Sequence, residues 1–147
     1  MTHDLRVERV YPAAPEVVFD AFTNPEAQKE MYADEPDWIV RSECDLRAGG
    51  RWTIEFGPPD GPPSRERCVF EVVERPWRLV FRSTMSMPDG SSVDTRTRVT
   101  FTETADGHTR LTVVQSGFPA TGLRDEFTQG WGGILAGLSR VVAARTT

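Results

Sequence analysis

The chain has 147 residues, and 17 Lys and Arg against 22 Asp and Glu give it a formal net charge of -5. This length fits one domain with a substantial core, so we expect a single domain over residues 1–147. Acidic and basic residues are mixed along the chain, which predicts no one-sided basic face. Nucleic acid is therefore not expected as a partner.

Membrane-directing segments are not predicted from the sequence. Residues 1–18 contain no apolar segment of the signal-peptide kind, and no uninterrupted apolar run approaches 18 residues. We therefore expect a cytoplasmic protein without membrane insertion. Cys44 and Cys68 are isolated, without C-x-x-C spacing or a companion histidine. Reduced, partly buried thiols are the simplest interpretation, and neither a metal nor another cofactor is predicted.

The predicted elements change their hydrophobic period along the chain. A first strand is expected over 5–11, followed by a helix that enters through Pro15 and a second short helix that restarts at "TNPE". From Trp38 onward apolar residues alternate at period two, which is typical of strands. Turn-forming stretches such as "GPPDGPPS" and "ADGH" separate these strands and indicate antiparallel hairpins. The clearest later strands are expected over 67–74, 77–85, 95–103 and 109–116.

A long final helix is predicted over 123–145. The order of elements indicates an α+β domain in which this helix covers a curved antiparallel sheet of about seven strands. Gly130, Gly133 and Gly137 line one flank of its apolar stripe, although each glycine costs about 1 kcal/mol in a helix interior. Two interpretations remain open, since the glycines could admit a neighbouring backbone or leave room for a cavity.

Four segments carry a resemblance to a known family. "APEVVFDAFTNPEAQKEMY", "DLRAGGRWTIEF", "GHTRLTVVQSGFP" and "GWGGILAGL" follow one another as in the activator of Hsp90 ATPase homologue 1-like family. That family is part of the START, Bet v 1 and polyketide cyclase (SRPBCC) superfamily. The resemblance implies a helix-grip fold, in which a seven-stranded antiparallel sheet wraps a long C-terminal helix around a cavity, with two short helices after the first strand.

The resemblance also implies a range of functions. Members of the superfamily are usually small-molecule binders, and some are cyclases, aromatase-like enzymes or hydrolases. The fold alone does not select among these activities. In the eukaryotic activators a separate N-terminal domain is important for engaging the chaperone. This chain leaves no room for one, so we do not expect direct activation of Hsp90.

No catalytic constellation is visible in the sequence. It contains no G-x-S-x-G, no H-E-x-x-H and no glycine-rich phosphate loop between a strand and a helix. His3 and His108 occupy positions typical of solvated histidines, and Glu43, Glu55 and the acidic cluster at 34–37 are expected at the surface. The catalytic residues therefore stay unknown, and enzymatic activity is left open.

Candidate ligand-binding residues are those expected on the inner face of the sheet and on the apolar stripe of the helix. Ser83 and Gln115 follow apolar residues at period two, so both are expected to project inward, where a polar group needs a partner from the protein, from water or from a ligand. Aromatic residues at this spacing are also typical of ordinary core. The predicted lining comprises Trp52, Phe56, Phe81, Ser83, Phe101, Gln115, Trp131 and Leu135.

Three functions follow as hypotheses. The leading one is binding of a small hydrophobic, aromatic or amphipathic ligand between sheet and C-terminal helix. The alternatives are a cyclase- or hydrolase-type enzyme acting in the same cavity and a cochaperone-like or stress-response interaction module. The small residues on the back of the helix could serve a homodimer contact, and a solvated face is equally compatible with them; they are Gly132, Ala136, Ser139 and Ala143.

Overall fold

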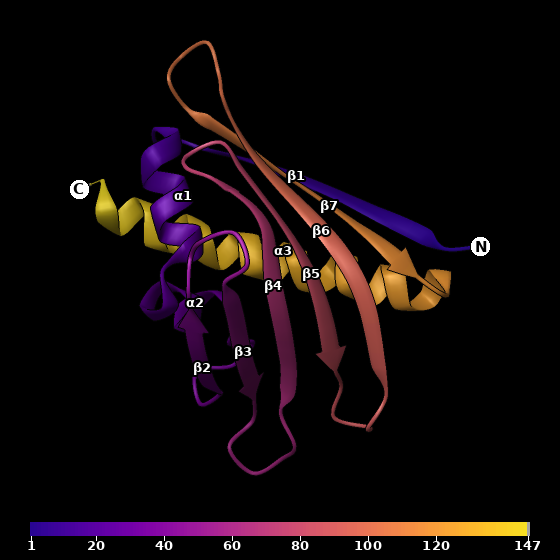
Figure 1. Ribbon diagram of the computed structural model, residues 1–147. Coiled ribbons are helices and arrows are strands. Elements are labelled where there is room, and N and C mark those ends of the chain that lie inside the picture. The colour runs from indigo at the N-terminus through magenta and orange to yellow at the C-terminus, as the bar shows by residue number, and fades with distance from the viewer. Residues whose placement is uncertain (147) are drawn as a thin grey trace.

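The structure of the protein is a computed structural model, which describes residues 1–146 (Figure 1). Seven strands and three helices occupy these residues. The strands are β1 (His3–Tyr11), β2 (Ile39–Cys44), β3 (Arg51–Gly57), β4 (Ser64–Glu74), β5 (Arg78–Ser86), β6 (Ser92–Glu103) and β7 (Thr109–Phe118). The helices are α1 (Pro15–Thr23), α2 (Pro25–Met31) and α3 (Thr121–Arg145).

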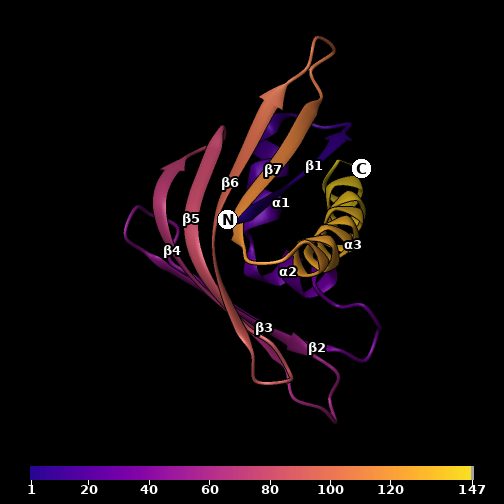
Figure 2. The same ribbon diagram turned by 90° about the vertical axis from the view of Figure 1, so that its right-hand side faces the viewer.

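All seven strands form one antiparallel sheet in the order β1-β7-β6-β5-β4-β3-β2. Strands β2 to β7 follow one another in space as they do in sequence, and β1 pairs with β7 at the far edge. Burial alternates along the strands, most regularly in β6, because successive side chains point to opposite faces. Figure 2 shows the sheet curving around α3, which lies against its inner face.

The two short helices are separate because of Asn24 and Pro25. Asn24 has an extended backbone conformation, and its side-chain Oδ1 accepts hydrogen bonds from the backbone N–H groups of Glu26 and Ala27. Pro25 has no N–H to continue α1 but fits the first turn of α2. The break predicted at "TNPE" is therefore confirmed. Helix α1 buries Phe19 and Phe22 against the sheet.

Helix α3 is attached to the sheet and to α2. The Tyr11 hydroxyl on β1 donates a hydrogen bond of 2.8 Å to the Leu135 backbone carbonyl. Gly137 lies directly against α2, since a Cβ added there would be 2.8 Å from the Met31 Cα. The close-approach interpretation therefore holds at Gly137. At Gly130 and Gly133 an added Cβ would meet no atom of another element within 4 Å in residues 1–146, so these two glycines have open space beside them.

The predicted element order is confirmed, with differences at the strand ends. Strand β6 begins at Ser92, three residues before the expected 95, because the preceding hairpin is tighter than predicted. Trp77 lies in the turn before β5, where its N–H bonds to the Glu74 carbonyl and its side chain is half exposed. None of the three helices in residues 1–146 is long and apolar enough to cross a membrane.

Candidate functional site

The structure contains a cavity of about 390 Å³ between the inner face of the sheet, α2 and α3. Most of the side chains around it are aromatic or carry a thioether, and the polar side chains among them are few. Its lining residues are Met31, Tyr32, Asp34, Trp38, Phe56, Ser64, Glu66, Met85, Met87, Gln115, Glu126, Phe127, Gly130, Trp131 and Ile134. This composition, apolar with a small number of placed polar groups, is that of a small-molecule site.

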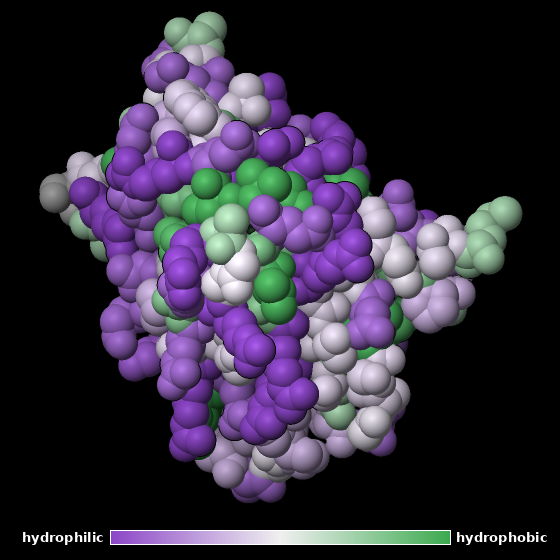
Figure 3. Space-filling view, in the orientation of Figure 1, coloured by the Kyte–Doolittle hydropathy of each residue, from purple (hydrophilic) through white to green (hydrophobic). Residues whose placement is uncertain are grey.

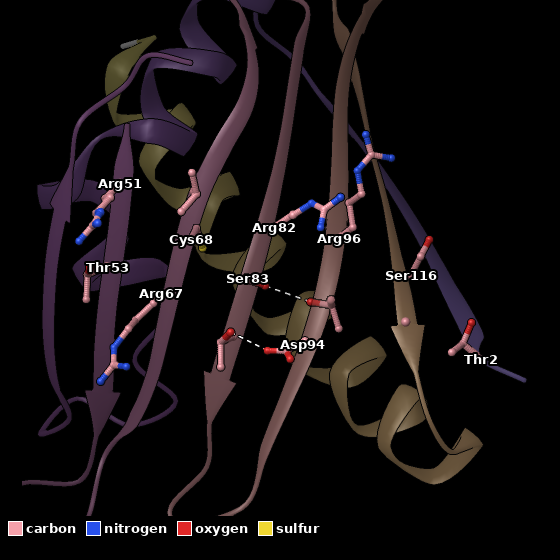
Figure 4. Close-up of a pocket in the computed structure, with 14 residues that line it drawn as sticks. Thr2, Arg51, Thr53, Arg67, Cys68, Arg82, Ser83, Asp94, Arg96 and Ser116 are labelled. Atoms are coloured by element: carbon pink, nitrogen blue, oxygen red, sulfur yellow. Dashed lines mark hydrogen bonds between the residues drawn. The ribbon is translucent and has the colours of Figure 1, made fainter. Parts of the chain in front are cut away.

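A second hollow of about 820 Å³ lies on the outer face of the sheet (Figure 4). Arg82 and Arg96 extend from neighbouring strands and share the Glu71 carboxylate, at 3.1 and 3.0 Å. Arg51 and Arg67 line the same hollow, and neither has an ion-pair partner within residues 1–146. Alternation along the strands thus gathers arginines that are scattered in the sequence. Asp94 lines the hollow as well, so its charge is mixed.

The outer hollow has a polar, charged lining, unlike the mostly apolar lining of a typical small-molecule site. Figure 3 shows that this face of the molecule is largely hydrophilic, with one hydrophobic patch. Its arginine side chains are exposed, and ion pairs between exposed groups contribute little because water screens them. The inner cavity instead combines apolar walls with buried polar groups. It is therefore the stronger candidate for a functional site.

A row of hydrogen-bonded side chains extends from α3 into the sheet beside the cavity. Trp131 Nε1 donates to Gln115 Oε1 at 2.8 Å, and Gln115 Nε2 donates to Thr95 Oγ1 at 2.9 Å. The hydroxyls of Thr95 and Ser83 are 3.0 Å apart, a contact drawn as a dashed line in Figure 4. All of these side chains are buried. The row thus connects α3, β7, β6 and β5.

Trp131 sets the direction of the first two hydrogen bonds in this row. An indole N–H can only donate, so Trp131 fixes the Gln115 carbonyl as acceptor and turns its amide N–H groups toward Thr95. The Thr95 and Ser83 hydroxyls share the next hydrogen bond, in which either oxygen can donate. Ser83 also opposes the rise in the pKa of Glu66. The row therefore ends at Ser83, near the carboxylate of Glu66.

Glu66 is the buried carboxylate of the cavity. It lies on the inner face of β4 with 7% of its surface exposed, opposite Ile54 on β3 and Met85 on β5. Burial raises its pKa to about 7, and the hydrogen bond from Ser83 opposes that rise. Among residues 1–146 Glu66 has no ion pair. A carboxylate with a raised pKa inside a cavity is typical of functional sites.

The structure divides the predicted lining residues into two groups. Phe56, Gln115 and Trp131 line the cavity, and Ser83 is the last residue of the hydrogen-bonded row. The others lie in closed core and do not line the cavity; they are Trp52, Phe81, Phe101 and Leu135. The three aromatic rings among them are already in contact with other rings, since Trp52 stacks on Phe70 and contacts Phe81, and Phe101 contacts α1. Helix α1 thus packs against residues that we expected to contact a ligand.

Glu66 was missed in the sequence because two arginines flank it. The stretch "SRERC" is typical of a solvated segment, and the predicted strand began only at 67. Extending the inward alternation of Phe70 and Cys68 back by two residues places Glu66 on the inner face. Glu55, in contrast, was correctly expected on the outer face, where it pairs with Arg65. Within residues 1–146 no three His, Cys, Asp or Glu side chains are grouped to hold a metal ion.

The architecture is an α+β helix-grip fold, with a seven-stranded antiparallel sheet and a long C-terminal helix. Residues 12–143 match the family described as activator of Hsp90 ATPase homolog 1-like protein. The chain therefore belongs to that family, and the resemblance found in the sequence is confirmed. A comparison with curated proteins finds no match.

Several solved structures are similar to the chain. A protein from Chromobacterium violaceum has 24% sequence identity and a TM-score of 0.81, with 95% of this chain and 96% of that one covered. An uncharacterised protein from Rhizobium leguminosarum has 22% identity and a TM-score of 0.81, over 98% and 96% of the two chains. A Rhizobium loti protein has 26% identity and a TM-score of 0.76, over 95% and 96%. These likenesses support the fold.

Proposed function

We propose that the protein binds a small hydrophobic or amphipathic molecule in the cavity between the sheet, α2 and α3. The observation that carries this proposal is the combination of apolar walls with two buried polar features, the hydrogen-bonded row from Trp131 to Ser83 and the carboxylate of Glu66. A volume of about 390 Å³ is within the range of small-molecule sites. Burial of the apolar body of a ligand would drive binding, and the polar row would orient it.

The walls suit ligands of more than one shape. Met31, Met85 and Met87 line the cavity, and unbranched thioether side chains adapt to irregular apolar surfaces. Trp131 stacks on Phe22 with ring centroids 6.4 Å apart, which holds the indole in place. Rigid aromatic rings therefore set one wall, while methionines form an adaptable part of the lining.

Acid–base catalysis in the same cavity is the second candidate function. Glu66 favours it, because a carboxyl with a pKa of about 7 exchanges protons readily near neutral pH. The cyclase- or hydrolase-type alternative thus has a candidate base that the sequence pattern did not reveal. The cochaperone-like alternative rests on the family alone.

Ligand binding can be tested by native mass spectrometry of the purified protein, together with a thermal-shift screen of aromatic, acyl and polyketide-like compounds. Gly130 lines the cavity and has open space beside it, so we expect Gly130→Leu to narrow the cavity and abolish the shift. Gly132→Leu is the matched control, since Gly132 also has open space but does not line the cavity. An equal shift in both variants would contradict the proposed site.

A further inference from the structure

The charged residues that line the inner cavity are all acidic. They are Glu66 on β4, which is buried, and Asp34 after α2 and Glu126 on α3, which are exposed; no Lys, Arg or His is among the lining residues. This one-sided charge is unlike the outer hollow, which four arginines line. A cavity of this kind favours a ligand of positive charge.

We propose that the ligand of this cavity is an organic cation, a protonated amine on an apolar aromatic or acyl body, with its ammonium group bound by Glu66. The inference rests on the proposed function and adds the chemical class of the ligand. Glu66 would accept hydrogen bonds from the ammonium group, and the apolar body would lie among the aromatic and methionine side chains.

The surroundings of Glu66 leave a place for such a group. Its neighbours across the sheet, Ile54 and Met85, carry no charge, and a carboxylate can accept several hydrogen bonds. Tyr32 and Cys68 also lie close enough to interact with its charge. A buried carboxylate is costly unless it is paired and hydrogen-bonded, and a bound ammonium would supply both.

Aromatic rings near the acidic residues would also stabilise a cation. Tyr32 and Phe56 are in contact with ring centroids 5.4 Å apart, and Trp38 stacks on Phe56 at 6.4 Å. All three rings line the cavity. The negative face of an aromatic ring attracts an ammonium group, more strongly where water is excluded. Rings and carboxylates thus favour the same class of ligand.

Carboxylate ligands should be excluded by the same arrangement. An anionic group would meet Glu66 together with Asp34 and Glu126, and the cavity lining has no cation to offset the repulsion. A neutral alcohol would keep the apolar contacts but form weaker hydrogen bonds. The expected order of affinity is therefore amine, then alcohol, then acid.

The proposal can be tested with three probes that share one body: 4-phenylbutylamine, 4-phenylbutanol and 4-phenylbutanoate. Their affinities would be measured by isothermal titration calorimetry at pH 8 for the natural protein, for Glu66→Gln and for Glu43→Gln. Glu43 is an exposed carboxylate on β2 and serves as the matched control. We expect Glu66→Gln to weaken amine binding by about 10- to 100-fold and to weaken alcohol binding much less.

The pH dependence gives a second readout. Amine affinity for the natural protein should fall as the pH is lowered from 8 to 5.5, because Glu66, with a pKa of about 7, loses its charge in that range. Burial raises the pKa of both Tyr32 and Cys68, so these two groups stay neutral throughout. Asp34 and Glu126 are the other acidic groups of the cavity, and Glu66→Gln retains both. Its amine affinity should therefore lack this pH-dependent loss.

The outcomes separate the two proposals. Equal binding of amine and alcohol, unaffected by Glu66→Gln, would overturn the cationic ligand and leave the cavity as a small-molecule site. Tighter binding of the acid than of the amine would also overturn it. Failure of all three probes to bind, together with equal thermal shifts for Gly130→Leu and Gly132→Leu, would overturn the cavity function itself.

Discussion

Replacing Glu66 with Gln should stabilise the protein, and the gain should depend on pH. The substitution keeps the shape of the side chain and removes a charge that is buried without a cationic partner. The pKa of Glu66 rises from an ordinary carboxyl value of 4.5 to about 7 in the folded protein. Each pH unit between the two values corresponds to about 1.4 kcal/mol. The charged form therefore costs the fold about 3 kcal/mol.

The direction in which stability changes with pH follows from proton binding to Glu66 in the folded and unfolded states. Between pH 4.5 and 7 the folded protein holds a proton on Glu66 that the unfolded chain has lost, so the natural protein loses stability as the pH rises through this range. Below pH 4.5 both states are protonated, and the cost disappears. The advantage of Glu66→Gln should thus grow from near zero at pH 4.5 to about 3 kcal/mol at pH 8.

Urea unfolding of both proteins at several pH values would measure this difference. The free energies of unfolding, extrapolated to water at each pH, should diverge as the pH rises. Glu43→Gln, which removes an exposed carboxylate from β2, is the matched control for the loss of one carboxylate. A constant difference for Glu66→Gln would refute the reasoning, because Glu66 would then titrate alike in both states.

Two further predictions concern pairs of similar residues in different surroundings. Gly137→Ala should destabilise the protein by about 1–3 kcal/mol because its Cβ would lie 2.8 Å from the α2 backbone. Gly132→Ala, with nothing within 4 Å, should stabilise it by about 1 kcal/mol, and thermal unfolding would distinguish the two. The Thr97 hydroxyl is buried and has no hydrogen-bond partner among residues 1–146, so Thr97→Val should not destabilise the protein. Thr109→Val should cost about 1–3 kcal/mol because it removes a buried 2.7 Å bond to a backbone carbonyl, and equal losses in urea unfolding would contradict this contrast.

The fold could be predicted largely because local signals agree with it. Pro25 and Asn24 separate the two short helices, and the alternation of β6 defines its inner face over most of its length. The site could be predicted only in part. Strand alternation indicates which side chains point to the inner face of the sheet, but not whether they line the cavity or lie in closed core. Phe56 and Phe101 have the same kind of pattern, yet Phe56 lines the cavity and Phe101 is covered by α1. That difference depends on where α1 packs, which no single stretch of sequence specifies.

The glycines of α3 differ in whether they serve packing or border the cavity. Gly137 is required by close packing on α2, whereas Gly130 leaves open space where the helix borders the cavity. Glu66 and Gly130 are alike in that each lowers the stability of the protein without ligand. In the proposed site, Glu66 would offer a ligand a carboxylate and Gly130 would offer it space. A bound ammonium group would favour the charged form of Glu66 and so lower its pKa toward the ordinary range. By linkage, an amine ligand should then offset the cost of that charge most fully above pH 7, where the empty protein carries all of it.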